Sequence, residues 1–116
     1  MTEHEANAFA GEWVAPWNAH DLPRILSHYS DGVVFMSPVA RRTVGNGEVR
    51  GKVALESYWS KALAARPDLR FELPGVFAGH CSATINDRNR RGQEAAETCE
   101  LDSTGQVVRS YACYRG

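Results

Sequence analysis

The sequence has few cysteines, no long apolar run and no excess of either charge. Its three cysteines, among 116 residues, show neither the spacing of a zinc site nor the even number of a disulfide framework. No apolar run approaches the roughly 18 residues of a membrane span, and the acidic, alanine-rich beginning does not resemble a signal peptide. Thirteen basic and 14 acidic residues leave a net charge of −1, without the basic field that draws proteins to nucleic acids or anionic membranes. These absences predict a cytoplasmic protein that binds neither nucleic acid nor membrane.

The four histidines do not form a metal-binding pattern. His4, His20, His28 and His80 stand apart in the sequence, and none has a second ligand at the i, i+4 spacing that places two side chains on one metal ion. His20 precedes Asp21, but adjacent side chains seldom face each other, and a solvated histidine beside a helix cap is the simpler interpretation. The sequence predicts no metal site and no cofactor.

The composition is that of an ordinary folded domain. Hydrophobic residues make up 43% and charged residues 23% of the chain, values typical of soluble globular proteins. A chain of 116 residues is too short for two separate cores. We expect residues 1–116 to form one domain with a core and room for one pocket.

Apolar residues recur at steps of three and four in the first half of the chain, which predicts three helices. They cover residues 2–18, a short stretch from Asp21 to about residue 29, and residues 53–65. Thr2 and Glu5 have the spacing of a capping box at the start of the first helix. Pro16 predicts a kink or an early end, because proline lacks an amide donor and crowds the preceding turn.

Alternating and β-branched residues predict strands elsewhere. A first strand covers residues 33–37, and the glycine- and arginine-rich residues 40–51 are expected to form a loop with at most a short strand. Four more strands follow, over residues 69–77, 82–89, 94–101 and 107–114. This order predicts an α+β fold in which three helices pack on the concave side of a curved antiparallel sheet.

Several segments, in this order, resemble one known superfamily. They are Trp17-Asn18-Ala19-His20-Asp21-Leu22, residues 29–38, Val49-Arg50-Gly51-Lys52, and the closing hairpin over residues 97–108. The chain resembles the nuclear transport factor 2-like proteins, also called cystatin-like, which include SnoaL-like and ketosteroid-isomerase-like domains. The resemblance implies a cone-shaped α+β fold with a deep pocket, and a homodimer formed through the outer face of the sheet. The superfamily includes isomerases, dehydratases, cyclases, epoxide hydrolases and binding modules, so the fold does not define the function.

The polar residues of ketosteroid isomerases are only partly present. The resemblance places their catalytic aspartate at Ser37, and a serine lacks the acidity to take a proton from carbon unaided. It places two pocket tyrosines at Trp13 and Trp59, whose indoles donate a hydrogen bond but neither accept one nor titrate. A second pocket acid falls at Glu97. Steroid isomerisation by that mechanism is therefore not expected, and Glu97 is the acid that remains.

The alternation of residues along the strand predicts which face of the sheet carries Glu97, without use of the resemblance. Glu97 shares a face with the apolar Cys99, so we expect it on the concave side, where a carboxyl group is either paired or raised in pKa. A tight turn before this strand would place Glu97 opposite Asn86 and diagonal to Arg88. Such a cluster would bind a polar group of a ligand. A structural ion pair, in which these residues bind only each other, explains the pattern equally well. A slip of one residue would dissolve the cluster and bring Asp87 close instead.

These considerations define one candidate site. Glu97 is the candidate catalytic acid/base, and the candidate ligand-binding residues are Trp13, Trp17, Phe35, Ser37, Tyr58, Trp59, Asn86, Arg88 and Cys99. Core packing is an alternative for each aromatic residue, but three tryptophans on helices that face a sheet suit a roomy apolar cavity.

Two classes of function remain open. The first is a cofactor-independent isomerase, cyclase or hydratase that acts on a small hydrophobic molecule. The second is a non-catalytic module of the same fold that binds a ligand or a protein. The outer face of the last strand is expected to carry Val107, Arg109, Tyr111 and Cys113. Of these, Tyr111 and Cys113 are the candidates for a homodimer interface.

Overall fold

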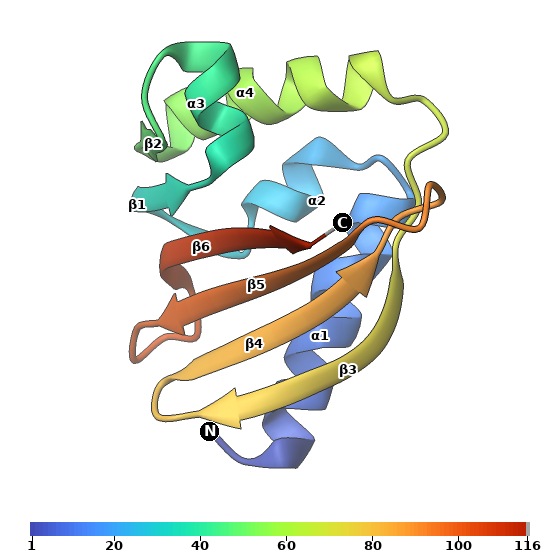
Figure 1. Cartoon of the computed structure of the whole chain (residues 1–116). Helices are drawn as coiled ribbons and strands as arrows, with labels where there is room; N and C mark the ends of the chain where they lie inside the picture. Colours follow the sequence, from blue (N-terminus) through green and yellow to red (C-terminus); the bar gives the residue numbers. More distant parts are fainter. Residues whose placement is uncertain (116) are drawn as a thin grey trace.

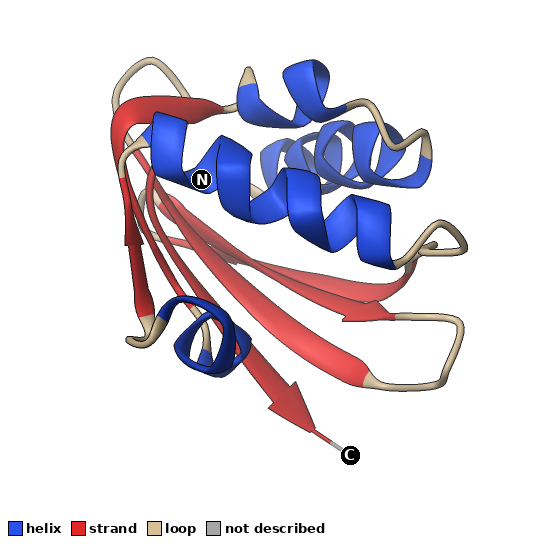
Figure 2. Cartoon of the chain, turned by 90° about the horizontal axis from the view of Figure 1, so that it is seen from above, coloured by secondary structure: helices blue, strands red, loops and turns tan. Residues whose placement is uncertain are grey.

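The computed structural model describes residues 1–115, and it has a curved six-stranded sheet with helices on one face (Figures 1 and 2). The helices are α1 (Glu3–Asn18), α2 (Leu22–Leu26), α3 (Pro38–Val44) and α4 (Lys52–Ala65). The strands are β1 (Tyr29–Met36), β2 (Glu48–Arg50), β3 (Glu72–Gly79), β4 (Ser82–Arg88), β5 (Glu94–Leu101) and β6 (Val107–Arg115). The predicted α+β class is confirmed.

The strand order is β2-β1-β6-β5-β4-β3. Neighbouring strands are antiparallel except β1 and β6, which run parallel. The meander from β3 to β6 therefore returns to the first strand of the chain, and the last strand lies in the middle of the sheet.

The start of α1 follows the prediction closely. Thr2 Oγ1 accepts a hydrogen bond from the Glu5 amide at 3.0 Å, and Glu5 Oε1 accepts one from the Thr2 amide at 2.8 Å, which completes a capping box. Pro16 does not end the helix early, since α1 continues to Asn18. The carbonyl of Pro16 accepts from the Asp21 amide at 2.9 Å, so the polar groups at the helix end remain satisfied.

Two elements differ from the prediction between α2 and α4. The first strand begins at Tyr29 rather than residue 33, and its pairing with β6 is irregular between Tyr29 and Val34. Residues 40–51 are not simply a loop, because α3 extends into them. Ser37 Oγ accepts from the Val39 amide at 3.1 Å and caps α3, so the Ser37-Pro38 pair starts a helix as well as ending a strand.

The hydrophobic core fills the space between the sheet and helices α1, α2 and α4. Its fully buried members include Ile25, Val33, Leu55, Ile85 and Val107. None of the helices within residues 1–115 is long and apolar enough to cross a membrane.

The end of α1 holds the chain between α4 and β3. Asn18 forms two hydrogen bonds with the backbone of Phe71, from Nδ2 to the carbonyl at 3.1 Å and from the amide to Oδ1 at 2.8 Å. His20 Nε2 lies 2.7 Å from the Leu69 carbonyl, and His20 has a left-handed φ of 55°. His20 therefore helps to hold the backbone in place, whereas the sequence suggests a solvated side chain.

Replacing Asn18 with alanine is expected to lower the free energy of unfolding by about 2 kcal/mol. The change removes both hydrogen bonds and leaves the Phe71 amide without its partner. Urea denaturation measures the loss. Asn7→Ala is the control, because Asn7 Nδ2 bonds only the Glu3 carbonyl on the exposed side of α1, and it should cost under about 0.5 kcal/mol. Equal effects of the two changes would contradict the role given to Asn18.

Candidate active site

A cavity of about 160 Å³ lies between the helices and the sheet. Its walls are mainly aromatic: Trp13, Trp17, Tyr29, Phe35, Tyr58, Trp59 and Phe71. Trp59 is central, since its ring lies 4.9 Å from that of Trp17, 5.0 Å from Tyr29 and 5.3 Å from Phe35, all edge to face. A dry cavity of similar size in another protein holds one benzene ring. This cavity therefore suits a compact molecule, or one ring of a larger one.

A carboxyl group of the sheet faces the cavity, and a second, buried carboxyl group lies beside it. Glu97 on β5 lines the cavity and pairs with Ile85 across β4, so Asp87 stands diagonal to it on the same face. Asp87 is 2% exposed. The two carboxyl groups are close enough that each shifts the pKa of the other, and Asp87 Oδ2 is buried without a hydrogen-bond partner within residues 1–115.

The surroundings favour the protonated form of both carboxyl groups. Burial raises the pKa of Glu97 well above its ordinary value of 4.5, and the neighbouring Asp87 raises it further. Burial also raises the pKa of Asp87. Because the two groups titrate together, the shared proton belongs to the pair rather than to either residue. A carboxyl group that holds its proton more tightly than usual can act as a general acid, and as a general base once it is ionised.

Tyr29 supplies a hydroxyl beside this pair. The residue is 2% exposed, and its oxygen accepts a hydrogen bond from Trp13 Nε1 at 3.2 Å. Its own O–H is therefore available to donate. Burial raises the pKa of Tyr29, as do the nearby Cys99 and Glu97, so the group stays a protonated donor.

Trp17 also lines the cavity and carries a second hydrogen-bond donor. Its Nε1 is buried and has no hydrogen-bond partner among residues 1–115. A buried N–H without a partner costs free energy, and a ligand acceptor would recover it. The site thus combines a shared proton with two hydrogen-bond donors inside an aromatic wall.

The sequence matches the family model of the SnoaL-like domain over residues 10–113. The chain belongs to the SnoaL-like family. The resemblance seen in the sequence motifs is thereby confirmed.

Solved structures of SnoaL-like and related folds match the whole chain. A SnoaL-like protein of unknown function from Burkholderia thailandensis shares 40% identity over 100% of this chain and 99% of its own, with a TM-score of 0.96. A candidate isomerase of the SnoaL-like family from Agrobacterium tumefaciens shares 15% identity over 97% and 99% of the two chains (TM-score 0.79). AclR, a candidate hydroxylase from Streptomyces galilaeus, shares 22% over 98% and 91% (TM-score 0.76). The last two show a common fold only. No curated protein matches the sequence.

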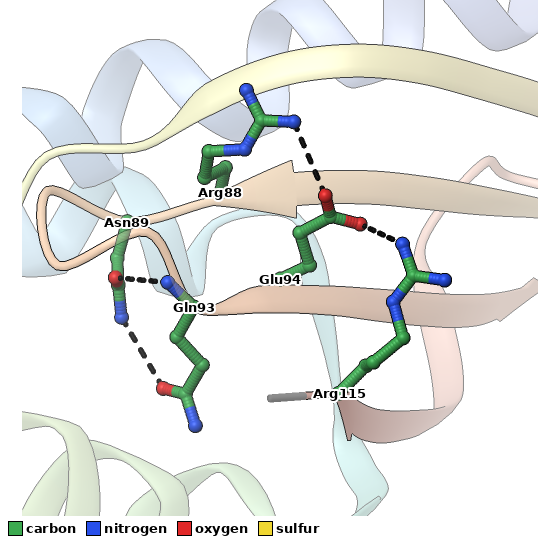
Figure 3. A network of polar contacts seen from close by, with 5 residues as sticks. All are labelled: Arg88, Asn89, Gln93, Glu94 and Arg115. Atoms are coloured by element: carbon green, nitrogen blue, oxygen red, sulfur yellow. Dashed lines mark hydrogen bonds and ion pairs between the residues drawn. The ribbon is translucent and has the colours of Figure 1, made fainter.

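Two residues predicted to bind ligand lie on the wrong face of this SnoaL-like sheet. Residues 89–93 form a wider loop than the predicted tight turn, closed by a 3.0 Å bond from the Asn89 amide to the Gln93 carbonyl. The register is therefore shifted by one residue, and Asn86 lies opposite Ala96 rather than Glu97. Arg88 points outward and forms an ion pair with Glu94 at 3.1 Å. Glu94 also pairs with Arg115, at 2.7 Å (Figure 3). The predicted cluster of Asn86, Glu97 and Arg88 is wrong.

The other predicted residues divide between the cavity and its surroundings. Trp13, Trp17, Phe35, Tyr58 and Trp59 line the cavity of the SnoaL-like domain, as Glu97 does. Their part in binding a ligand stays a prediction.

Ser37 and Cys99 lie outside the residues that line the cavity. Ser37 caps α3 and shares a hydrogen bond with Tyr114, so it supports the wall of the cavity. Cys99 is fully buried, and burial raises its pKa to about 12. The thiol is therefore unsuited to act as a nucleophile at neutral pH.

Sequence reasoning missed Asp87 and Tyr29 as parts of the site. Asp87 entered only as the result of a register slip, and that slip is the observed register. Tyr29 looked like the last apolar residue of a helix, whereas it begins β1. No three His, Cys, Asp or Glu side chains within residues 1–115 are grouped to hold a metal ion.

The predicted outer face of the last strand needs one correction. Val107 is fully buried and belongs to the core, because the pairing of β5 with β6 shifts between Glu100 and Leu101. Arg109 and Cys113 are exposed, and Arg109 pairs with Glu100 on β5. The homodimer itself stays a prediction.

Proposed function

We propose that this protein catalyses proton transfer on a small, largely apolar molecule bound in the aromatic cavity. The observation that carries the proposal is Glu97, which lines that cavity together with Tyr29 and is coupled to the buried carboxyl group of Asp87. Carboxyl groups with raised pKa values in an apolar site are suited to general acid/base catalysis near neutral pH.

The geometry supports one sequence of steps. In its ionised form, Glu97 takes a proton from a carbon next to a substrate carbonyl, and the electron pair of the broken C–H bond moves onto the carbonyl oxygen. The Tyr29 hydroxyl and the Trp17 N–H donate hydrogen bonds to this oxyanion. Asp87 positions Glu97 and adjusts its proton affinity without touching the substrate.

The fate of the enolate defines the reaction class. Return of the proton from Glu97 to a different carbon completes an isomerisation. Expulsion of a hydroxide from the next carbon, protonated by Glu97 as it leaves, completes a dehydration, and the reverse step is a hydration. Attack of the enolate carbon on a second carbonyl of the same molecule forms a C–C bond and an alkoxide, and protonation of that alkoxide by Glu97 completes a cyclisation. All three need only the shared proton and the two donors.

The pH dependence of a model reaction tests the proposal. 5-Nitrobenzisoxazole opens to a coloured nitrophenolate when a base removes its ring proton, and its aromatic rings are compact. The rate with the wild-type protein should rise with pH through the raised pKa of the pair, because only the ionised pair removes the proton. Asp87→Asn should move this rise to lower pH, because it removes a negative neighbour and offers an amide donor to Glu97.

Asp102→Asn is the matched control, since Asp102 lies in the β5–β6 turn, bonded to Thr104 and Gln106. Its profile should coincide with that of the wild type. A rate that is independent of pH, or the same profile in all three proteins, contradicts the proposal. If the probe quenches tryptophan fluorescence but is not converted, the cavity is a binding site without catalysis.

A further inference from the structure

A single guanidinium group stands among the residues that line the cavity, that of Arg66. Arg66 follows the last turn of α4 and precedes Pro67, which restricts its backbone to φ −131° and ψ 68°. Its amide bonds the Leu63 carbonyl at 3.2 Å, and its carbonyl accepts from the Leu69 amide at 3.0 Å. The backbone that carries this side chain is therefore fixed on both sides.

The Arg66 side chain has no partner within residues 1–115. None of the four ion pairs there includes it, and its Nε is buried without a hydrogen-bond acceptor. Buried polar groups are nearly always paired. The nearby arginines differ, because Arg88 and Arg115 are both held by Glu94 (Figure 3).

Two amide side chains line the cavity together with Arg66. Asn89 Nδ2 donates to Gln93 Oε1 at 3.3 Å, and Asn89 Oδ1 accepts from the Gln93 amide at 3.1 Å. Figure 3 shows the side-chain nitrogen of Gln93 turned away from Asn89. These contacts occupy the side-chain oxygens of both residues and leave side-chain N–H groups that can donate to a ligand.

The cavity is thus polarised along its length. Arg66, Asn89 and Gln93 belong to the α4 end and the β4–β5 loop, and they offer donors and one positive charge. The Asp87–Glu97 pair belongs to the sheet and repels an anion whenever it is ionised. An anionic group would therefore bind at Arg66 and leave the apolar part of its molecule against the aromatic wall.

We propose that the ligand is a compact ring compound with a carboxylate group, and that Arg66 binds this carboxylate. A planar guanidinium fits a carboxylate with two parallel hydrogen bonds, and one positive charge balances one negative charge. The identity of this molecule as a substrate rests on the proposed function, but its binding does not.

The test compares phenylacetate with 2-phenylethanol, a neutral probe of similar size, by quenching of tryptophan fluorescence. The wild-type protein should bind phenylacetate about 10-fold more tightly than the alcohol. Arg66→Gln should remove this preference by weakening phenylacetate about 10-fold, with the affinity for the alcohol unchanged. Arg66→Lys should keep part of the preference, because the charge remains while the paired hydrogen bonds are lost.

Arg70→Gln is the control, because Arg70 is exposed and lines other hollows of the surface. It should leave both affinities unchanged. A structural role of Arg66, such as stabilising the carboxyl end of α4, would lower the melting temperature without changing the preference. An equal loss for both probes, no preference in the wild type, or no binding of either probe overturns the proposal.

Failure of this proposal and failure of the proposed function are distinguishable. Glu97→Gln should abolish proton transfer but leave phenylacetate binding intact or stronger, because it removes a potential negative charge from the cavity. If Arg66→Gln loses the preference while Glu97→Gln keeps full turnover, the carboxylate site stands and the catalytic role of Glu97 does not. The converse result leaves the acid/base role standing and rejects the carboxylate site.

Discussion

Glu97→Gln is expected to lower proton transfer to 5-nitrobenzisoxazole at least 100-fold above the pKa of the carboxyl pair. The amide keeps the shape of the side chain but cannot accept a proton, and a positioned general base contributes about 100-fold or more to rate. Glu100→Gln is the matched control, because Glu100 lies on the same strand but points to the exposed face. Wild-type turnover by Glu97→Gln would remove Glu97 from the mechanism.

The same change is expected to stabilise the fold at neutral pH. Burial raises the pKa of Glu97 above its ordinary value of 4.5, so the folded protein holds a proton that the unfolded chain releases. The contribution of Glu97 to stability is therefore fully present below pH 4.5 and is lost as pH rises through the raised pKa. Glutamine does not titrate, and the variant should be more stable than the wild type by about 1 kcal/mol above that range.

The difference in stability between the wild type and Glu97→Gln isolates the effect of Glu97, because all other titrating groups are common to both proteins. Thermal denaturation over a series of pH values should show melting temperatures that converge at acidic pH and diverge as pH rises. A divergence in the opposite direction would mean that the folded state favours the ionised carboxyl group. Loss of activity together with a gain in stability is the signature of a residue kept for function.

Trp59→Ala is expected to cost about 3–5 kcal/mol, the largest loss of stability among these predictions. The indole is 5% exposed and contacts the rings of Trp17, Tyr29 and Phe35, so its removal enlarges the cavity and breaks three aromatic contacts. Domains of this size have total stabilities of about 5–15 kcal/mol. Urea denaturation should show the midpoint falling with little change in slope.

Two additional measurements separate packing from other causes. Trp59→Phe should cost clearly less than the alanine change, because it retains an aromatic ring at this position. Indole should raise the melting temperature of Trp59→Ala by filling the enlarged cavity. A cost below about 1 kcal/mol, or no response to indole, would show that Trp59 is not central to the wall.

Local sequence signals predicted much of this fold. The capping box of Thr2 and Glu5, and the cap at Asp21, each depend on residues within one helical turn, and all are present. Helix α3 was missed because Ser37-Pro38 fits both the end of a strand and the start of a helix. The aromatic wall followed from helical periodicity, which places Trp13 and Trp17 on one face.

The polar part of the site depended on one loop. A difference of one residue in the register of β4 and β5 turns Asn86 and Arg88 outward and brings Asp87 to Glu97. The width of the loop over residues 89–93 decides that register, and no local pattern specified it. Arg66 was overlooked for a similar reason, since only the path from α4 to β3 brings it to the cavity.

The position of β6 has a consequence for how the chain folds during synthesis. This strand is made after every other strand of the sheet, yet it lies between β1 and β5, and its Ser110 and Tyr114 line the cavity. Until it leaves the ribosome, the tryptophans of α1 and α4 have no complete sheet to cover them, and β1 has an open edge toward the missing strand. Nascent chains should therefore be more prone to aggregate, and more dependent on chaperones, than the finished protein.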